Sequence, residues 1–247
     1  AGVFFPVMIY IDMQKSGYIN NIDNGFFACA LFIGVVMAVF CSLFIGTEYS
    51  DGTIRNKVVI GQKRTSIYLS NLIICALVSV VMCAAFFIAY LCIGIPLLGF
   101  FEMDIKQVLL FTLAVFVLAI AFASIFTLIS MLNHNKAITA VVCILLAFLL
   151  LFAGAQFNKM LNEPETNMGL MMTDNGQEYQ EIPNPNYLEG GERKVVQFLY
   201  DFVPGGQALQ CVSLEANNIT VLPAYSLIII VLTTGFGVFF FKKKELK

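Results

Sequence analysis

The sequence predicts an all-α integral membrane protein. Hydrophobic residues make up 59% of the 247 residues and charged residues only 12%, whereas soluble domains carry about 25% charged residues. Several uncharged apolar runs reach the roughly 20 residues that cross a bilayer as a helix. Lipid offers no hydrogen-bond partners for backbone amides, so these runs are expected to be helices and not isolated strands.

Five of the apolar runs are long enough to be complete spans. They cover residues 26–46, 68–99, 108–132, 137–156 and 223–241. Residues 1–10 are apolar but too short to cross the bilayer. We expect them to be part of a truncated first span, preceded by a cytoplasmic segment. The intact chain would then have six spans in a single transmembrane domain, with both termini in the cytoplasm.

One of these spans lies in an unusually long uncharged stretch. Residues 67–101 carry no charge, and a helix of that length exceeds the roughly 30 Å hydrocarbon core. We expect either an interfacial entry near residues 67–70 or a break at Gly94-Ile95-Pro96, because proline removes a backbone donor.

Basic residues are concentrated on one side of the predicted membrane. Nine of the 14 Lys and Arg residues, but only three of the 16 acidic residues, fall in the loops at 47–67 and 133–136 and at the C-terminal end. Cationic loops stay in the cytoplasm. Residues 47–67 are therefore predicted to be inside and the insert at 157–222 outside. This distribution leaves no basic stripe for nucleic acid.

The loop at residues 47–67 shows signs of internal structure. Ser50 or Asp51 can cap a helix start, and Gly61 can end that helix in a left-handed conformation. Ile54 and Val58 share one helical face. The loop is thus predicted to contain a short docking helix. A solvated loop that serves only to fix the topology is the alternative, and the charge count alone does not decide between them.

The external insert divides into two parts. Its first half is rich in Asn, Pro, Gly and Glu, which predicts a loop. Its second half has an apolar run at residues 195–203, a break at Pro204-Gly205-Gly206-Gln207 and a second run at 208–214. We expect two short helices or a partly re-entrant hairpin.

Motifs for catalysis and metal binding are missing. The sequence has no Gly-x-x-x-x-Gly-Lys-Ser/Thr loop for nucleotide phosphates, and His134 is the only histidine, which rules out a histidine triad or a multi-histidine metal site. The predicted spans contain no Asp, Glu, Lys or Arg that could relay ions or protons. A transporter of this kind needs energy from another subunit, and the chain is not expected to be an enzyme.

The loop residues Glu48-Tyr49-x-x-Gly52-Thr53-Ile54-Arg55-Asn56-Lys57, followed by Gly61-x-x-Arg64 and Ile67-Tyr68, resemble the first cytoplasmic loop of bacterial ABC type-2 permeases. The resemblance is narrower to the permeases of bacitracin and lantibiotic export. It implies that this loop touches an ATPase subunit. The residues it implicates in coupling are Glu48, Gly52, Thr53, Arg55, Asn56, Lys57, Gly61 and Arg64.

The external pattern Phe202-x-Pro204-x-Gly206-Gln207 also resembles these permeases and makes Phe202, Pro204, Gly206 and Gln207 candidates for an outer gate. A simple conformational break would explain the same residues. The resemblance further implies two permease halves, identical or different, with two ATPase subunits that hold ATP and magnesium. No cofactor is expected in this chain.

The combined expectation is the permease half of a bacterial ABC exporter in the plasma membrane. Its substrate would be an amphipathic or hydrophobic molecule, such as a peptide antibiotic, a drug or a lipid, because the spans present few charges. The alternative is an immunity or sensor subunit that binds a peptide at the outer face without transporting it.

Overall fold

The structure is a computed structural model that describes residues 1–17, 20–173 and 176–244. Within these residues, five helical segments are long and apolar enough to cross a membrane: Asp23–Ser50, Arg64–Leu98, Ile105–Leu132, Lys136–Leu161 and Val221–Lys243. The first consists of α2 (Asp23–Phe26) and α3 (Cys29–Ser50), and the others are α5, α6, α7 and α10. Each coincides with one predicted span, and the bounds differ by a few residues.

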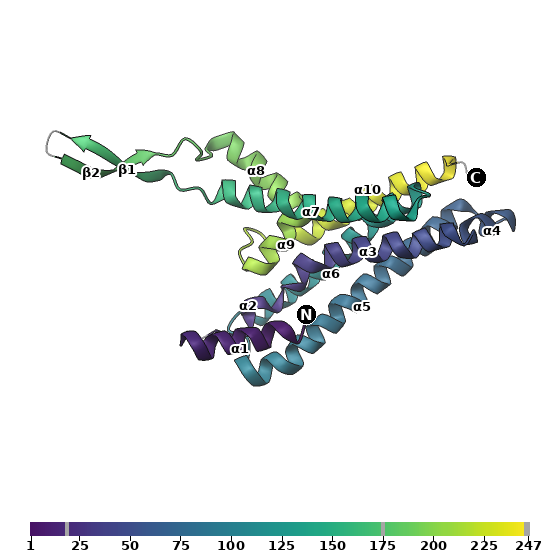
Figure 1. The fold of residues 1–247 in the computed structure, drawn as a ribbon, viewed down its shortest axis with the longest axis horizontal. Coiled ribbons are helices and arrows are strands. Elements are labelled where there is room, and N and C mark those ends of the chain that lie inside the picture. Colours follow the sequence, from purple (N-terminus) through teal and green to yellow (C-terminus); the bar gives the residue numbers. More distant parts are fainter. Residues whose placement is uncertain (18–19, 174–175, 245–247) are drawn as a thin grey trace.

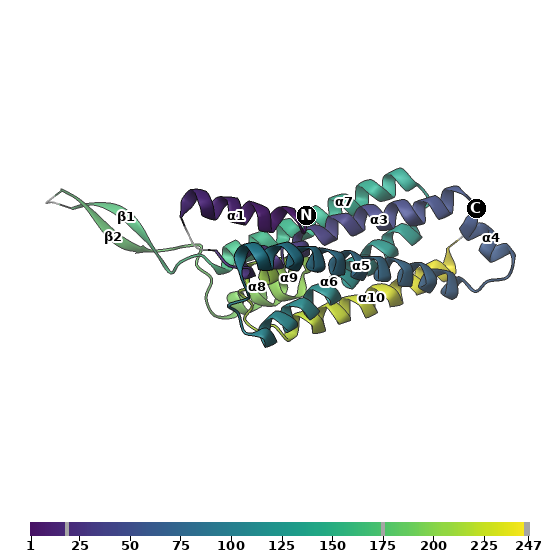
Figure 2. The ribbon, with the colours of Figure 1, turned by 90° about the horizontal axis from the view of Figure 1, so that it is seen from below.

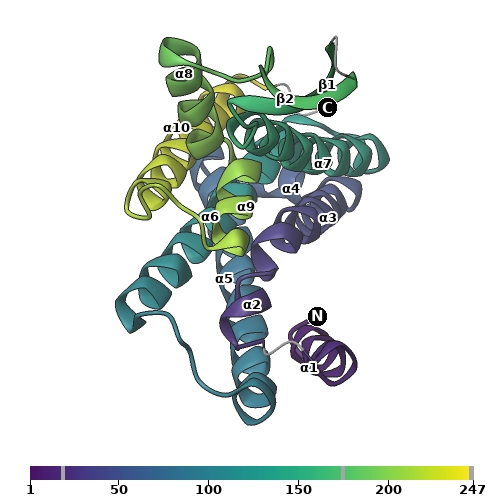
Figure 3. The ribbon, with the colours of Figure 1, turned by 90° about the vertical axis from the view of Figure 1, so that its left-hand side faces the viewer.

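Helices α3 and α6 form the centre of the bundle. Helix α6 packs against α3, α5 and α10, whereas α3 also packs against α7 (Figures 1 and 3). At the crossing of the two central helices, Gly34 lies against the ring of Phe122, which stacks on Phe126. The peripheral helices expose large apolar side chains on their outer faces, as a lipid-facing surface requires. Examples are Ile73, Leu77, Val81, Leu145, Leu149, Phe152, Val231 and Phe236.

Helix α5 is continuous over all 35 residues from Arg64 to Leu98. The predicted break at residues 94–96 is wrong. Pro96 lies in the last turn, where few further backbone bonds depend on it, and the helix ends two residues later at Leu98, just before Gly99, whose φ is 84°. The predicted entry near residues 67–70 is also part of this helix, which begins at Arg64.

The chain begins with a separate short helix, α1 (Phe4–Ser16). It contains residues 4–10 of the predicted partial span and continues through the polar residues that follow. After it, α2 is kinked at Asn24 and Gly25. The buried Asp23 accepts hydrogen bonds from the backbone amides of Glu102 (2.9 Å) and Met103 (3.2 Å). These bonds hold the α5–α6 connection against the start of α3.

The insert between α7 and α10 begins with a β-hairpin that the sequence analysis missed. Strands β1 (Thr166–Thr173) and β2 (Gly176–Pro183) pair antiparallel, from Thr166 opposite Pro183 to Thr173 opposite Gly176. The prediction of a loop is therefore wrong here. The sequence signal that was overlooked is the run Asp174-Asn175-Gly176, three residue types that favour turns. The hairpin projects far beyond the helices (Figures 1 and 2).

Two short helices follow the hairpin, as predicted. They are α8 (Gly190–Phe202) and α9 (Pro204–Ser213), with Pro204 at the first position of α9. Proline suits that position because its missing N–H would have no intrahelical partner there. Helix α9 packs against α7, α6 and α3 at the hairpin end of the bundle.

Candidate functional site at the α4 end

The short helix predicted in the loop is present as α4 (Thr53–Val59), at the end of the molecule opposite the hairpin (Figure 1). Gly52 precedes it with φ of 69°, and Gly61 follows it with φ of 89°. The amide of Gln62 donates to the carbonyl of Lys57, and that of Gly61 to Val58, both at 3.0 Å. This pair of bonds is a Schellman ending, so Gly61 terminates the helix as predicted.

The predicted start of α4 is wrong in its detail. Ser50 and Asp51 do not cap it, because Ser50 is the last residue of α3 and its hydroxyl donates to the carbonyl of Gly46 at 2.9 Å. In the described part of the chain, α4 begins without a side-chain cap, at the left-handed Gly52. The chain therefore turns within two residues, and α4 stays in contact with α3.

Helix α4 has a seated face and a free face. Ile54 is fully buried and Val58 is partly buried in the core, as the i,i+4 spacing predicted. Val59 and Ile60 are 77% and 74% exposed, and Arg55 and Asn56 are exposed beside them. The free face thus combines apolar and cationic side chains.

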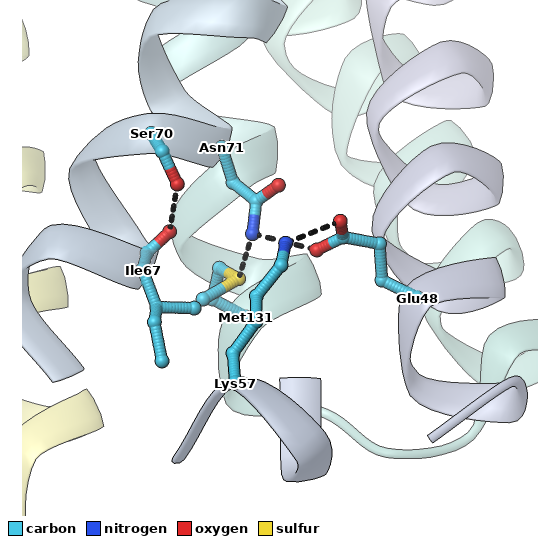
Figure 4. Close-up of polar contacts among 6 residues, drawn as sticks. All are labelled: Glu48, Lys57, Ile67, Ser70, Asn71 and Met131. Atoms are coloured by element: carbon cyan, nitrogen blue, oxygen red, sulfur yellow. Dashed lines mark hydrogen bonds and ion pairs between the residues drawn. The ribbon is translucent and has the colours of Figure 1, made fainter. Parts of the chain in front are cut away.

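A group of side chains that we call the Glu48 cluster connects α4 to the spans. It comprises Glu48, Lys57, Asn71 and Met131 (Figure 4). The Lys57 Nζ lies 2.7 Å from the Glu48 Oε1, and the Asn71 Nδ2 donates to the Glu48 Oε2 at 3.0 Å. The same Nδ2 lies 3.7 Å from the Met131 Sδ. The cluster therefore joins α3, α4, α5 and α6.

The Glu48–Lys57 pair is largely shielded from solvent. The side chains of Lys57 and Glu48 are 27% and 17% exposed, and Asn71 is fully buried. Breaking a buried pair by removing one partner leaves the other charge without compensation, which costs more than losing a surface pair. The cluster therefore favours one position of α4 relative to α3 and α5.

Tyr49 extends these contacts toward the last span. Its hydroxyl donates to the Met131 carbonyl at 2.6 Å. The Lys244 Nζ donates to the Tyr49 hydroxyl and to the Met131 carbonyl, both at 2.8 Å, and lies 4.3 Å from the centre of the Tyr49 ring. Burial lowers the pKa of Lys244 to about 8. Burial and the nearby Lys244 also lower the pKa of His134, whose ring packs edge-on against Tyr49.

The structure places the predicted coupling residues in three positions. Gly52, Thr53, Arg55 and Asn56 belong to α4 and its start, Gly61 to its end, and Glu48 and Lys57 to the Glu48 cluster. Arg64 lies apart, at the first position of α5, and its Nη1 donates to the carbonyls of Lys242 (3.0 Å) and Lys244.

Arg55, one of the predicted coupling residues, is not the ion-pair partner of Glu48: among the described residues that ion pair comes from Lys57. Arg55 points to the exposed face instead. Asn71, Met131 and Lys244 were not among the residues predicted from the sequence. Asn71 carried a signal, since it is the only asparagine in the span predicted at residues 68–99, and a polar side chain inside a span usually has a partner.

At the hairpin end, the four candidate gate residues lie at the α8–α9 junction. Gln207 is buried, donates from Nε2 to the Phe202 carbonyl at 3.2 Å and accepts from the Ser226 hydroxyl of α10 at 2.6 Å. Pro204 and Gly206 are buried, and Phe202 packs against Tyr225 of α10. The junction is therefore bonded to α10 and packed into the bundle.

Fold and site together define a multi-pass helical membrane protein with a short, two-faced helix held between its first two complete spans. The family model described as "ABC-2 family transporter protein" matches residues 6–172, well over half of the chain. The chain belongs to this family and is the membrane-embedded transport subunit of an ABC transporter, which works with an ABC ATPase. Neither the curated proteins nor the solved structures include a significant match.

The matched residues begin within α1 and end in the first strand of the hairpin. They include α4 and every member of the Glu48 cluster. Helices α8, α9 and α10 lie beyond the match, so the contacts of Gln207, Ser226 and Lys244 come from the structure alone.

Proposed function

We propose that this chain is the permease half of a bacterial ABC exporter and that α4 is its docking element for the ATPase. The observation that carries the proposal is the two-faced geometry of α4. Ile54 and the Lys57–Glu48 ion pair hold one face against the bundle, while Arg55, Asn56, Val59 and Ile60 remain exposed. A partner that pushes on the exposed face would displace α3 and α5 through the Glu48 cluster.

The orientation follows from the charges at the two ends. The α4 end carries the basic loops, and cationic loops are retained in the cytoplasm. We therefore place α4 and the end of α10 in the cytoplasm of a bacterial cell and the hairpin, α8 and α9 outside the plasma membrane. Two such permeases, identical or different, would act with two ATPase subunits, which would hold ATP and magnesium.

The substrate class is argued from a surface groove of about 760 Å³ along α3. Its walls are mostly valine, leucine and phenylalanine, and Glu48 and Asp51 lie at one end. An amphipathic molecule with an apolar body and a polar or cationic end would fit such a groove. A peptide antibiotic of the bacitracin or lantibiotic type, an apolar drug and a lipid share this chemistry.

We further propose that α9 closes the outer end of the pathway. Its contacts with α6, α7 and α3 and the Gln207–Ser226 hydrogen bond support this role. Because Gln207 is bonded to α10, opening would require α9 and α10 to separate or to move as one unit.

The first prediction tests the docking role with Arg55→Ala. Arg55 is exposed, so its removal should change the stability of the permease by less than about 0.5 kcal/mol. The variant should still bind its ABC ATPase. ATP hydrolysis should no longer respond to bacitracin, a lantibiotic or an apolar dye, because alanine cannot replace the hydrogen-bond donors of the guanidinium group. The measurement is the rate of ATP hydrolysis in liposomes with and without each compound.

The matched control is Lys63→Ala, which removes an exposed charge from the same loop but outside α4. It should hydrolyse ATP like the unmodified complex. If Arg55→Ala keeps a normal response, Arg55 serves only to orient the chain. If no ATPase co-purifies with the unmodified permease, the transport proposal itself is wrong.

A further inference from the structure

The end of α10 is bound to the same cluster that holds α4. Lys244 is the residue directly after α10, and its side chain reaches back to Tyr49 on α3 and to the Met131 carbonyl on α6. Tyr49 is the sequence neighbour of Glu48, and Met131 is a member of the Glu48 cluster. One lysine thus connects the last span to the helices on which α4 rests.

Arg64 makes a second connection, in which a side chain of α5 binds the backbone at the end of α10. The last carbonyls of a helix lack intrahelical partners, and the Arg64 Nη1 donates to two carbonyls at the end of α10, those of Lys242 and Lys244. Arg64 is the first residue of α5, only a short turn after α4. The end of α10 is therefore fixed by one side chain of its own and by one from α5.

Neighbouring lysines show that orientation alone does not require these contacts. Lys242 and Lys243 have exposed side chains, and the Lys243 Nζ lies 4.2 Å from the ring of Phe239 within α10 itself. Both can act as interfacial anchors. Lys244, in contrast, is half buried and contacts two other helices.

We propose that Lys244 and Arg64 are positioning residues that couple α10 to α4, so that the last span moves together with the docking helix during transport. The proposal rests on the proposed function of α4. It adds a connection that the family match, which ends at residue 172, does not include. An ATPase-driven shift of α4 would reach α3 and α5 through Glu48 and Asn71, and α10 through Tyr49, Met131 and Arg64.

The experiment measures the movement of α10 directly. Spin labels are placed at Val231 on α10 and Leu145 on α7, two lipid-facing positions that are 69% and 63% exposed, in a chain cleared of native cysteines. The distance between them is measured in the complex with its ATPase, without nucleotide and with ATP-vanadate. In the otherwise unmodified complex, vanadate trapping should change this distance.

Lys244→Met should abolish most of that change while ATP binding and vanadate trapping persist, because methionine keeps most of the length of the side chain but has no N–H donor. Lys244→Arg should restore the movement, and Lys243→Met should behave like the unmodified protein. If Lys244→Met does not insert into the membrane, Tyr49→Phe is the second variant. It removes only the hydroxyl that accepts from Lys244, and it should also reduce the vanadate-dependent change in distance.

The outcomes separate the two proposals. If Lys244→Met and Tyr49→Phe show the same vanadate-dependent change in distance as the unmodified protein, the proposed coupling of α10 to α4 is wrong. The proposed role of α4 would not be affected. If the unmodified complex shows no vanadate-dependent change although the ATPase is trapped, the proposed action of α4 is wrong as well.

Discussion

Lys244 illustrates at the residue scale how a charge can serve more than one purpose. Its ammonium group satisfies the positive-inside pattern, and it also donates to Tyr49 and Met131 from a half-buried position. Burial disfavours the protonated amine, which is why its pKa falls to about 8 from 10.5. The neutral amine still has two hydrogens, enough for both bonds.

The pH dependence of this contact follows from proton linkage. Above pH 8 the docked Lys244 loses its proton, whereas a released lysine keeps its proton until about pH 10.5. The released state therefore binds more protons between these values, and docking becomes more favourable as pH rises. A spin label at Lys243 should become less mobile between pH 7 and pH 9.5.

The control is Lys244→Met, in which the mobility of the same label should not change with pH in this range. His134 also faces Tyr49, but its lowered pKa leaves it neutral throughout. Glu48, Lys57, Arg64 and Lys136 line the same end of the molecule. Increasing mobility with rising pH would show that the charged form of Lys244, and not its burial, dominates the contact.

Individual residues were predictable from the sequence where their role is local. The burial of Ile54 and Val58 follows from i,i+4 spacing, and the left-handed Gly61 follows from its place after a short helix. Lys244 and Met131 could not be found this way. Their partners lie on helices that are far away in the sequence. Whether Lys57 or Arg55 forms the ion pair with Glu48 depends on how α4 is rotated about its axis.

At the scale of elements, α9 is held against α7 by direct backbone contact. A Cβ atom added to Gly154 of α7 would lie 2.4 Å from the Gly205 carbonyl carbon, and one added to Gly205 would lie 1.9 Å from the Leu150 carbonyl oxygen. Two glycines thus allow the helices to approach as closely as small residues permit in membrane helix packing. Side-chain repacking cannot relieve a clash with backbone atoms.

Gly154→Ala should therefore push α9 away from α7 and destabilise the permease by roughly 1–3 kcal/mol, the usual cost of overpacking. A lower midpoint of thermal unfolding in detergent would show this. We also expect altered export, because α9 would no longer close the outer end as proposed.

The matched substitution is Gly235→Ala on α10, where an added Cβ meets nothing within 4 Å. It should leave the midpoint unchanged or raise it slightly, since alanine is the better helix former. Equal midpoints for both variants would mean that the α7–α9 contact is looser than the structure indicates.

The predictability of the elements depended on their hydrophobic pattern. Uncharged runs of span length identified every long helix, and Pro204 marked the α8–α9 junction. The hairpin was missed because its residues lack a clear alternation and contact each other more than the bundle. The continuity of α5 could not be predicted from the presence of Pro96 alone. A proline interrupts a helix in its interior, but Pro96 lies in the last turn of α5.

At the scale of the whole molecule, the α4 end and the hairpin end lie at opposite ends of the bundle (Figure 1). The charge distribution predicts that these ends lie on opposite sides of the membrane. Single cysteines at Gln62 and Asn167, both exposed, test that assignment in a chain without native cysteines. A membrane-impermeant maleimide added to whole cells should label position 167 and not position 62.

Permeabilised cells serve as the control, because both positions should then react. Labelling of position 62 in intact cells would reverse the orientation and place α4 out of reach of a cytoplasmic ATPase. The docking proposal could not survive that result.

The length of α5 also limits the lipid environment in which this protein can work. A helix of 35 residues is about 52 Å long at 1.5 Å per residue, whereas the hydrocarbon core is about 30 Å thick. Its polar side chains are concentrated in the first two turns, at Arg64, Thr65, Ser66, Ser70 and Asn71, and the apolar remainder is still longer than the hydrocarbon core. Tilting or local thickening of the bilayer accommodates such a mismatch. The energy needed to reorient α5 therefore depends on acyl-chain length, which links the transport cycle to the thickness of the host membrane.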